Sequence, residues 1–519
     1  MVSGTHPWHK HIFSALLLMC STLVQAAASY DLAIIGGRVI DPESGLDAIR
    51  NIAVQADKIV LITEQPISAR KTIDAAGQVV SPGFIDLHAH GQSILAGRMQ
   101  ALDGVTTALE LESGMLPVAE YYASRAKEGR AINYGASVNW ASARIGALLN
   151  VDPQNDLEWV DKIFSETSWQ QAVTTPEQLD NIKQRVNQGL QQGALGVGFL
   201  SGYAPGAGYK EYYALSKLAA DWGVPTFTHA RFLSMSEPNS SFQAIEEIVA
   251  VAASTGVHAH IVHLNSISLH DIDLIAELIG GAQQRGVKLS TEAYPYGAGS
   301  TGIGAAMFKG DHWREQIGGV SAHNFEVAGK RLTEHEFTWL QTNKPETEVI
   351  IHFLDLAKAE DQAKLDKAVL FAKGAIASDG GAWLLDGKQV EQHSWPIPAK
   401  AWSHPRSAAT YARFIRNYVR ERGVLSVSQA IEKASLIPAQ ILQAAVPQMA
   451  HKGRLQVGAD ADIIVFDLDK VSDQASFAEP AKPSTGFNYV IVNGVVLVDD
   501  GQLNSSVLPG KAIRRPVTE

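Results

Sequence analysis

Apolar strands and helical segments alternate through the middle of this chain, and that alternation limits the folds open to it. Each helical pattern leads into a short apolar run, as in 176–192 before 195–200, 215–222 before 226–229, and 241–255 before 260–264. Parallel strands need a crossover of about a dozen residues or more, which a helix of this length provides. The pattern predicts repeated βα units and an α/β fold of the (β/α)₈ TIM-barrel type.

Both ends of the chain are β-rich instead. Short β-type runs and turns fill residues 30–74, and the same texture returns in 461–466 and 489–498. We expect the two ends to assemble into one small β-sandwich beside the barrel. The expected division is a signal peptide (1–26), a first sandwich part (27–80), the barrel (81–447) and a second sandwich part (448–519). A less regular region, 301–348, is expected to form an insertion over the barrel mouth.

The first residues have the pattern of a cleaved signal peptide. Lys10 precedes an apolar run over 12–24, and small residues follow at 26–28. Cleavage after Ala26 would deliver the protein to the periplasm or outside the cell. The only cysteine of the 519 residues, Cys20, lies in this segment, and Met19 before it does not suit lipidation. The mature chain then has no cysteine, which excludes disulfides and thiolate metal ligands.

Charge and hydropathy narrow the range of partners. The net charge is −11, and the acidic residues are spread along the sequence rather than clustered. No basic patch suits nucleic acid, and no later segment is long and apolar enough to be an integral membrane span. A small-molecule substrate is the partner we expect, and oligomeric state is left open by the sequence.

The strongest local signal is the stretch Pro-Gly-Phe-Ile-Asp-Leu-His-Ala-His at 82–90. Side chains two residues apart on a strand point to the same face, so His88 and His90 aim into one space. Neutral imidazole is the commonest metal ligand in proteins, and this pair can chelate an ion. A packed or surface pair without metal is the alternative, and the strand that precedes the pair favours the metal.

Three further candidates end later predicted strands. His229 closes the run 225–229, His263 closes 260–263, and Asp379 closes 374–379. In a barrel all carboxyl ends of the strands share one face, which holds the active site. Each residue alone would pass for a core histidine or a helix-capping aspartate. Their common placement predicts instead that they converge with the histidine pair.

The strand 106–112 carries two carboxylates one residue apart. Such a pair on a buried face is costly unless a cation or proton neutralises it. Glu112 lies nearer the carboxyl end and is the better candidate metal ligand, with a salt bridge to a barrel arginine as the alternative. Glu110, one step deeper, could support a ligating histidine. We interpret His258 and His260 as packing or helix-contact residues on the opposite face from His263.

Together these motifs resemble the amidohydrolase superfamily, whose late Gly-Ala-Asp-Ala-Asp-Ile-Ile-Val-Phe block is matched at 458–466. Within it the chain is most similar to the N-acyl-D-amino-acid deacylases, or D-aminoacylases. The supporting segments are Gly-Val-Thr-Thr at 104–107, His-Ala-Arg at 229–231, Tyr-Pro-Tyr at 294–296 with Ser-Thr at 300–301, and His-Pro-Arg at 404–406. The resemblance covers essentially the whole mature chain.

The resemblance implies one or two zinc-type ions. His88, His90 and Asp379 would surround one metal site, with His229 and His263 at another. Asp379 would also be the catalytic general base.

The resemblance also implies a clamp for the substrate carboxylate, made of Tyr294, Ser300 and Arg406, with Arg231 as a weaker candidate. A guanidinium pairs bidentately with a carboxylate, which suits Arg406 to this role. A structural ion pair for Arg406 and a packing role for Tyr294 are the alternatives.

One departure from the family is specific. The D-aminoacylases supply a cysteine thiolate at the end of the second strand, where this chain has Glu112 followed by Ser113. A carboxylate there could bridge two ions, as a carboxylated lysine does elsewhere in the superfamily. The fourth strand, 195–200, contains no lysine, so Glu112 is the obvious substitute.

The expected activity is metal-dependent hydrolysis of an amide bond, releasing a carboxylic acid and a D-amino acid. A dipeptidase, cyclic amidase or lactonase of the same superfamily is the alternative, because barrel loops support many chemistries. A non-catalytic binding protein is the remote alternative, opposed by the intact set of ligand candidates.

Overall fold

The computed structural model describes residues 30–155, 159 and 166–518, together with Gly4. The expected signal peptide and Cys20 lie outside the described residues. In the part of the chain that is described, no helix is both long and apolar enough to cross a membrane.

Eight parallel strands form the barrel, in the spatial order β17-β12-β11-β10-β9-β8-β7-β6. They are β6 (Phe84–Asp86), β7 (Val105–Met115), β8 (Asn133–Asn139), β9 (Val197–Leu200), β10 (Thr226–His229), β11 (Ala259–Ile261), β12 (Leu289–Ala293) and β17 (Ala375–Ile376). The barrel closes just beyond β6 and β17, where the Asp379 amide donates to the His88 carbonyl (2.8 Å) and the His90 amide to the Gly380 carbonyl (2.8 Å). The predicted barrel fold is confirmed.

Helices between the strands complete the βα units. The longer ones are α1 (Ile94–Ala101), α2 (Val118–Glu128), α3 (Trp140–Leu149), α6 (Pro176–Gln191), α7 (Tyr209–Asp221), α8 (Ser241–Thr255), α10 (Ile272–Gln284), α13 (Ala359–Val369) and α14 (Arg406–Phe414). Local signals set their ends: Thr175 and Gln178 form a reciprocal capping box at the start of α6, with Pro176 in the first turn. α7 begins six residues earlier than expected, directly after Gly208.

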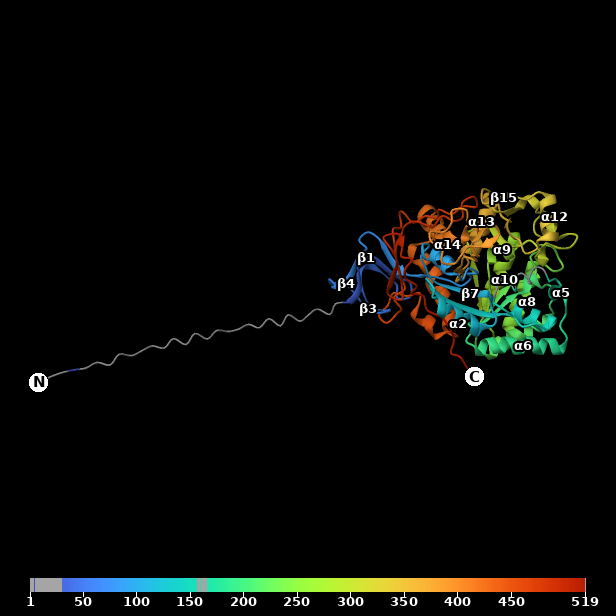
Figure 1. Ribbon diagram of the computed structural model, residues 1–519, viewed down its shortest axis with the longest axis horizontal. Coiled ribbons are helices and arrows are strands. Elements are labelled where there is room, and N and C mark those ends of the chain that lie inside the picture. Colours follow the sequence, from blue (N-terminus) through green and yellow to red (C-terminus); the bar gives the residue numbers. More distant parts are fainter. Residues whose placement is uncertain (1–3, 5–29, 156–158, 160–165, 519) are drawn as a thin grey trace.

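Strands from both ends of the chain share one nine-stranded sheet beside the barrel. The N-terminal part supplies β1 (Tyr30–Asp41), β2 (Leu46–Gln55), β3 (Lys58–Thr63), β4 (Ala69–Asp74) and β5 (Val79–Pro82). The C-terminal part supplies β20 (Ile463–Phe466), β21 (Phe487–Val492), β22 (Val495–Asp499) and β23 (Gln502–Leu503). The antiparallel pair β5–β20 joins the two parts, so blue and red strands lie together in Figure 1. The expected sandwich built from both ends is confirmed.

After β23 the chain leaves this sheet and runs along the barrel. The Ile513 amide donates to the Tyr134 carbonyl of β8 (2.7 Å), and the guanidinium of Arg514 stacks on the ring of Tyr122 (4.6 Å).

The expected insertion is a small subdomain between β12 and β17. Its four-stranded sheet contains β13 (Ala298–Gly302), β14 (Phe325–Val327), β15 (Lys330–Arg331) and β16 (Glu348–His352), with α12 (Glu334–Asn343) beside it. It has its own aromatic core, in which Trp313 stacks on Phe337 with ring centroids 5.6 Å apart. In Figure 1, α12 and β15 lie at the opposite end of the molecule from β1 and β3.

Candidate active site

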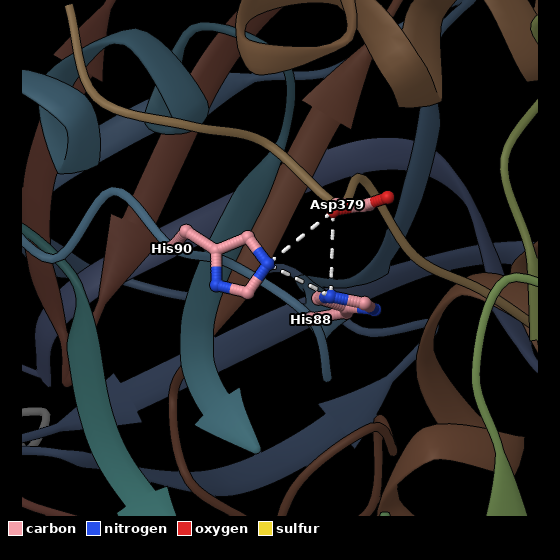
Figure 2. Close-up of side chains that lie close together, drawn as sticks. All are labelled: His88, His90 and Asp379. Atoms are coloured by element: carbon pink, nitrogen blue, oxygen red, sulfur yellow. Dashed lines mark hydrogen bonds and ion pairs between the residues drawn. The ribbon is translucent and has the colours of Figure 1, made fainter. Parts of the chain in front are cut away.

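Three predicted ligands meet where β6 and β17 end. The Nε2 atoms of His88 and His90 are 3.0 Å apart, and Oδ1 of Asp379 lies 3.4 Å from each of them. Figure 2 shows the two imidazoles and the carboxylate turned toward one common point. These atoms are close enough to bind a single metal ion.

A second cluster lies beside the first and is connected to it by one carboxylate. Oε1 of Glu112 is 2.9 Å from Nδ1 of His229 and 3.0 Å from Nε2 of His263. Oε2 of the same side chain lies 3.1 Å from Nε2 of His88 and 3.3 Å from Nε2 of His90. Each oxygen of Glu112 therefore faces a different group of histidines, which is the arrangement of a carboxylate that bridges two ions.

The backbone at the strand ends is unusual where ligands leave it. His263 and Asp379 both have left-handed backbone angles, with φ of 33° and 51°, a conformation that costs free energy in a residue other than glycine. At His263 this geometry ends β11 two residues earlier than expected and starts the short helix α9 (Leu264–Ser268). The strained angles turn both side chains into the space between the clusters.

The Nδ1 atoms of His88 and His90, which point away from the proposed ion, contact carboxylates. Nδ1 of His88 lies 2.5 Å from Oε1 of Glu292, and Nδ1 of His90 lies 3.0 Å from Oε1 of Glu110. An ionised carboxylate can only accept, so each Nδ1 carries a proton and each neutral ring presents an Nε2 lone pair to the other. The predicted supporting role of Glu110 agrees with this contact.

This donor set fits a divalent cation. Two lone pairs 3.0 Å apart, facing the Glu112 carboxylate, repel one another unless positive charge lies between them. Burial opposes protonation, yet the charges of Asp379 and Glu112 raise the pKa of His88. The surrounding carboxylates therefore stabilise a positive charge at this point. Protons on both Nε2 atoms would set two N–H groups against each other, whereas one ion satisfies both rings.

Sequence reasoning missed Glu292. It lies on β12, fully buried, where its Oε1 accepts from His88 and its Oε2 accepts from Nε2 of His260 at 3.0 Å. Although burial opposes the shift, the neighbouring imidazoles lower its pKa to about 2. A lone carboxylate on a short buried strand, two residues before Tyr294, was the available signal.

The interpretation of His260 as a packing residue was therefore incomplete. The ring is fully buried against Phe227, but it also reaches the site through Glu292. Its Nδ1 lies 2.8 Å from Oγ of Ser290, which also lies 2.8 Å from Nε2 of His258. A chain of hydrogen bonds thus runs from His258 to the ligating histidine.

We expect Glu292→Gln to weaken metal binding about tenfold to a hundredfold, as losses of such supporting groups commonly do. A glutamine offers one accepting oxygen and an NH₂ group, so either His88 or His260 faces a donor. Zinc affinity by competition with a chromogenic chelator measures the effect, with the melting temperature of the apo-protein as the folding control. Wild-type affinity in the variant would show that Glu292 does not support the site.

Gly202, in the turn η1 (Ser201–Tyr203), leaves room for His229. A β-carbon at this position would lie 2.6 Å from Nε2 of His229 and 2.9 Å from the Ala230 carbonyl, closer than such contacts occur. We expect Gly202→Ala to displace the imidazole and lower zinc affinity at least about tenfold. Gly208→Ala is the matched control, because its β-carbon would meet only Val173 at 3.7 Å. Equal zinc affinity in both variants, measured by chelator competition, would contradict this role.

Both clusters open into a cavity of about 1850 Å³ that the insertion helps to line. Among its lining residues are Tyr294, Ser300 and Arg406, the predicted clamp for the substrate carboxylate. The guanidinium of Arg406 lies over the ring of Tyr294 at 4.6 Å, and its Nη1 is 2.9 Å from Oδ2 of Asp379. Nε of Arg406 is buried without a hydrogen-bond partner among the described residues.

The structure does not bring Arg231 together with these residues, so the geometry gives its predicted substrate role no support. Its side chain is 1% exposed and is absent from the cavity lining. Glu247 accepts from its Nε and Nη2 at 2.8 and 2.7 Å, and the Ala207 carbonyl accepts from Nη1 at 2.5 Å. Its donors are therefore satisfied within the protein, on the side of Glu247 and the Ala207 carbonyl, whereas the preceding residue, Ala230, lines the cavity.

A parallel barrel with two histidine–carboxylate clusters at one rim defines a metal-dependent barrel hydrolase. The sequence model of the amidohydrolase family matches residues 79–497. The chain belongs to the amidohydrolase family, and the predicted class of enzyme, a hydrolase of carbon–nitrogen bonds, is confirmed.

Curated relatives and solved structures agree with this membership. The chain is 25% identical to the N-acyl-D-glutamate deacylase of Alcaligenes xylosoxydans xylosoxydans, over 93% of this chain and 96% of the relative. It is 26% identical to the D-aminoacylase of the same organism, over 90% and 94%. The fold is similar to a zinc- and phosphonate-bound N-acyl-D-glutamate deacylase from Bordetella bronchiseptica, with a TM-score of 0.72, 22% identity, and coverage of 94% of this chain and 100% of that one.

Proposed function

We propose that this enzyme hydrolyses N-acyl-D-amino acids to a carboxylic acid and a D-amino acid. The observation that carries the proposal is the buried Arg406 beside Asp379, at the edge of a histidine site that Glu112 spans. A substrate carboxylate on Arg406 would place the neighbouring amide at the two clusters. The relatives named above support this substrate class.

The metal-binding residues in this proposal are the six predicted from the sequence. His88, His90 and Asp379 would hold one ion, His229 and His263 would hold a second, and Glu112 would contribute to both sites. Zinc is the metal we expect, because imidazole and carboxylate ligands suit it. A divalent ion held here supplies hydroxide near neutral pH and polarises the scissile carbonyl.

Asp379 is the proposed general base. Burial alone would raise its pKa, but the charges of Arg406 and His88 and the hydrogen bond to His90 together outweigh burial and lower it, so the carboxylate is ionised. Its Oδ1 faces the first cluster, where it accepts the proton of the attacking water, and the same oxygen returns that proton to the leaving nitrogen. A substrate carboxylate that engages Arg406 would compete for the guanidinium that Oδ2 now contacts.

Export is part of the proposal. The pattern at 1–26 supports a periplasmic or secreted enzyme, with residues 27–80 and 448–519 flanking a barrel of 81–447. The cavity has a buried guanidinium, which suits a substrate with a free carboxylate and gives no specific support to a cyclic amide or lactone that lacks one.

The test is an assay of paired N-acetyl-D- and N-acetyl-L-amino acids with the zinc-loaded protein, scored as released amine. We expect release from the D-series alone. In Arg406→Lys, the loss of the planar fork should raise KM about tenfold or more. Arg413→Lys is the matched control, since Arg413 stacks on Tyr296 at the same 4.6 Å but does not line the cavity. No release from either series, in protein shown to hold metal, would reject the proposal.

A further inference from the structure

A glutamate lies inside the predicted carboxylate clamp. Glu348, the first residue of β16, is half-buried and lines the cavity. Its Oε1 accepts a hydrogen bond from Oγ of Ser300 at 2.8 Å. The same oxygen lies 3.4 Å from where a β-carbon on Gly381 would be, two residues after Asp379. The hydroxyl assigned to a substrate carboxylate is therefore already engaged by a carboxylate of the protein.

The charges around this point leave Glu348 undercompensated. Arg406 belongs to the same predicted clamp, but its Nη1 makes an ion pair with Oδ2 of Asp379. In the described part of the chain, no lysine or arginine forms an ion pair with Glu348. Burial raises the pKa of Glu348, with Arg406 acting in the opposite direction. Because the ion pair of Arg406 is made with Asp379, Glu348 has no cationic partner of its own among the described residues, and a partly buried charge in this state is costly until a cation joins it.

The unpaired charge of Glu348 indicates which kind of substrate group would bind beside it. A substrate with a second carboxylate, as in the relatives named for N-acyl-D-glutamate and N-acyl-D-aspartate, would bring a further negative charge to a cavity wall that already carries Glu348. A substrate with a cationic group would instead place its α-carboxylate on Arg406 and its positive charge on Glu348. Glu348 and the α-carboxylate of the substrate would then each have a cationic partner.

We propose that Glu348 binds a cationic group of the substrate, so that the enzyme prefers N-acyl-D-amino acids carrying an ammonium or guanidinium group. This inference rests on the proposed deacylase function and names its substrate class. The cation can belong to a basic side chain of the D-amino acid or to an amino group on the acyl part. Both sources share the chemistry that Glu348 recognises.

The experiment compares matched substrates on the zinc-loaded protein. N-acetyl-D-lysine against N-acetyl-D-norleucine tests a side-chain cation, and glycyl-D-alanine against N-acetyl-D-alanine tests a cation on the acyl part. In the wild type we expect kcat/KM to favour the cationic member of at least one pair by about tenfold or more, a size typical of a partly desolvated charge pair. The pair that shows the preference identifies the source.

The variant Glu348→Gln should lose most of that preference, because its kcat/KM should fall much further for the cationic substrate than for the neutral partner. Glu346→Gln is the matched control, because it removes the same charge from an exposed residue on the same cavity wall. Wild-type ratios near one in both pairs, or an equal fall for both partners in Glu348→Gln, would overturn the inference while leaving the deacylase function intact. The wild-type ratios do not depend on the folding of any variant. No turnover of any N-acyl-D-amino acid would reject the proposed function and this inference with it.

Discussion

Asp379→Asn is expected to lower kcat by about 10²- to 10⁴-fold, the range found when a positioned general acid or base is removed. The amide keeps the size of the side chain but cannot take a proton from water at neutral pH. The backbone at position 379 is left-handed, with φ of 51°, and asparagine adopts this conformation as readily as aspartate, so the fold should tolerate the change.

Steady-state kinetics on the best N-acyl-D-amino acid measures this loss, with metal content determined on the same samples. Asp386→Asn is the matched control, since Asp386 also lines the cavity and also has a left-handed φ, of 53°. A variant that retains both ions and at least a tenth of wild-type kcat would remove Asp379 from the role of base.

Glu112→Gln is expected to abolish simultaneous binding of two ions and to lower activity by more than about a hundredfold. Both oxygens of this carboxylate face histidine nitrogens, Oε1 toward His229 and His263 and Oε2 toward His88. A glutamine has one oxygen to offer, and its NH₂ group would point at one cluster as a donor that no metal site tolerates.

Zinc stoichiometry by mass spectrometry on the desalted protein checks this, with catalytic activity measured in parallel. The control is Glu110→Gln, two residues earlier on the same strand. Glu110 meets Nδ1 of His90, and a glutamine oxygen can still accept from that N–H, so a smaller effect is expected. Two tightly bound ions in Glu112→Gln would contradict the bridging role.

Much of this site could be predicted because its residues occupy positions with a simple geometric meaning. His88 and His90 follow β6 closely, His229 ends β10, and His263 and Asp379 come two and three residues after β11 and β17, so all of them reach the rim that the carboxyl ends of parallel strands share. Glu112 was recognisable because a buried carboxylate without a partner is costly.

The remaining residues carry no such signal. Glu292 supports the site from the barrel interior, where an isolated glutamate looks like any other strand residue. Gly202 matters only because His229 passes close to it, a contact between distant segments that sequence does not display. Arg231 lies outside the cavity lining although it is only two residues after His229, because nearness along the chain is not nearness to the cavity. The early end of β11 follows from the strained backbone at His263 rather than from any propensity.

The pairing of β5 with β20 also sets the order in which the enzyme can mature. β5 leads through Gly83 alone into β6, the strand before the histidine pair, and the Gly83 amide donates to the Asp462 carbonyl at 2.9 Å. The strand that carries the first ligands is therefore clamped by residues made nearly four hundred positions later. Contacts of such sequence separation form late, because a long loop must close first. Metal loading should accordingly follow synthesis of residues 463–466, so that an arrested, shorter chain would expose its histidines without assembling a metal centre.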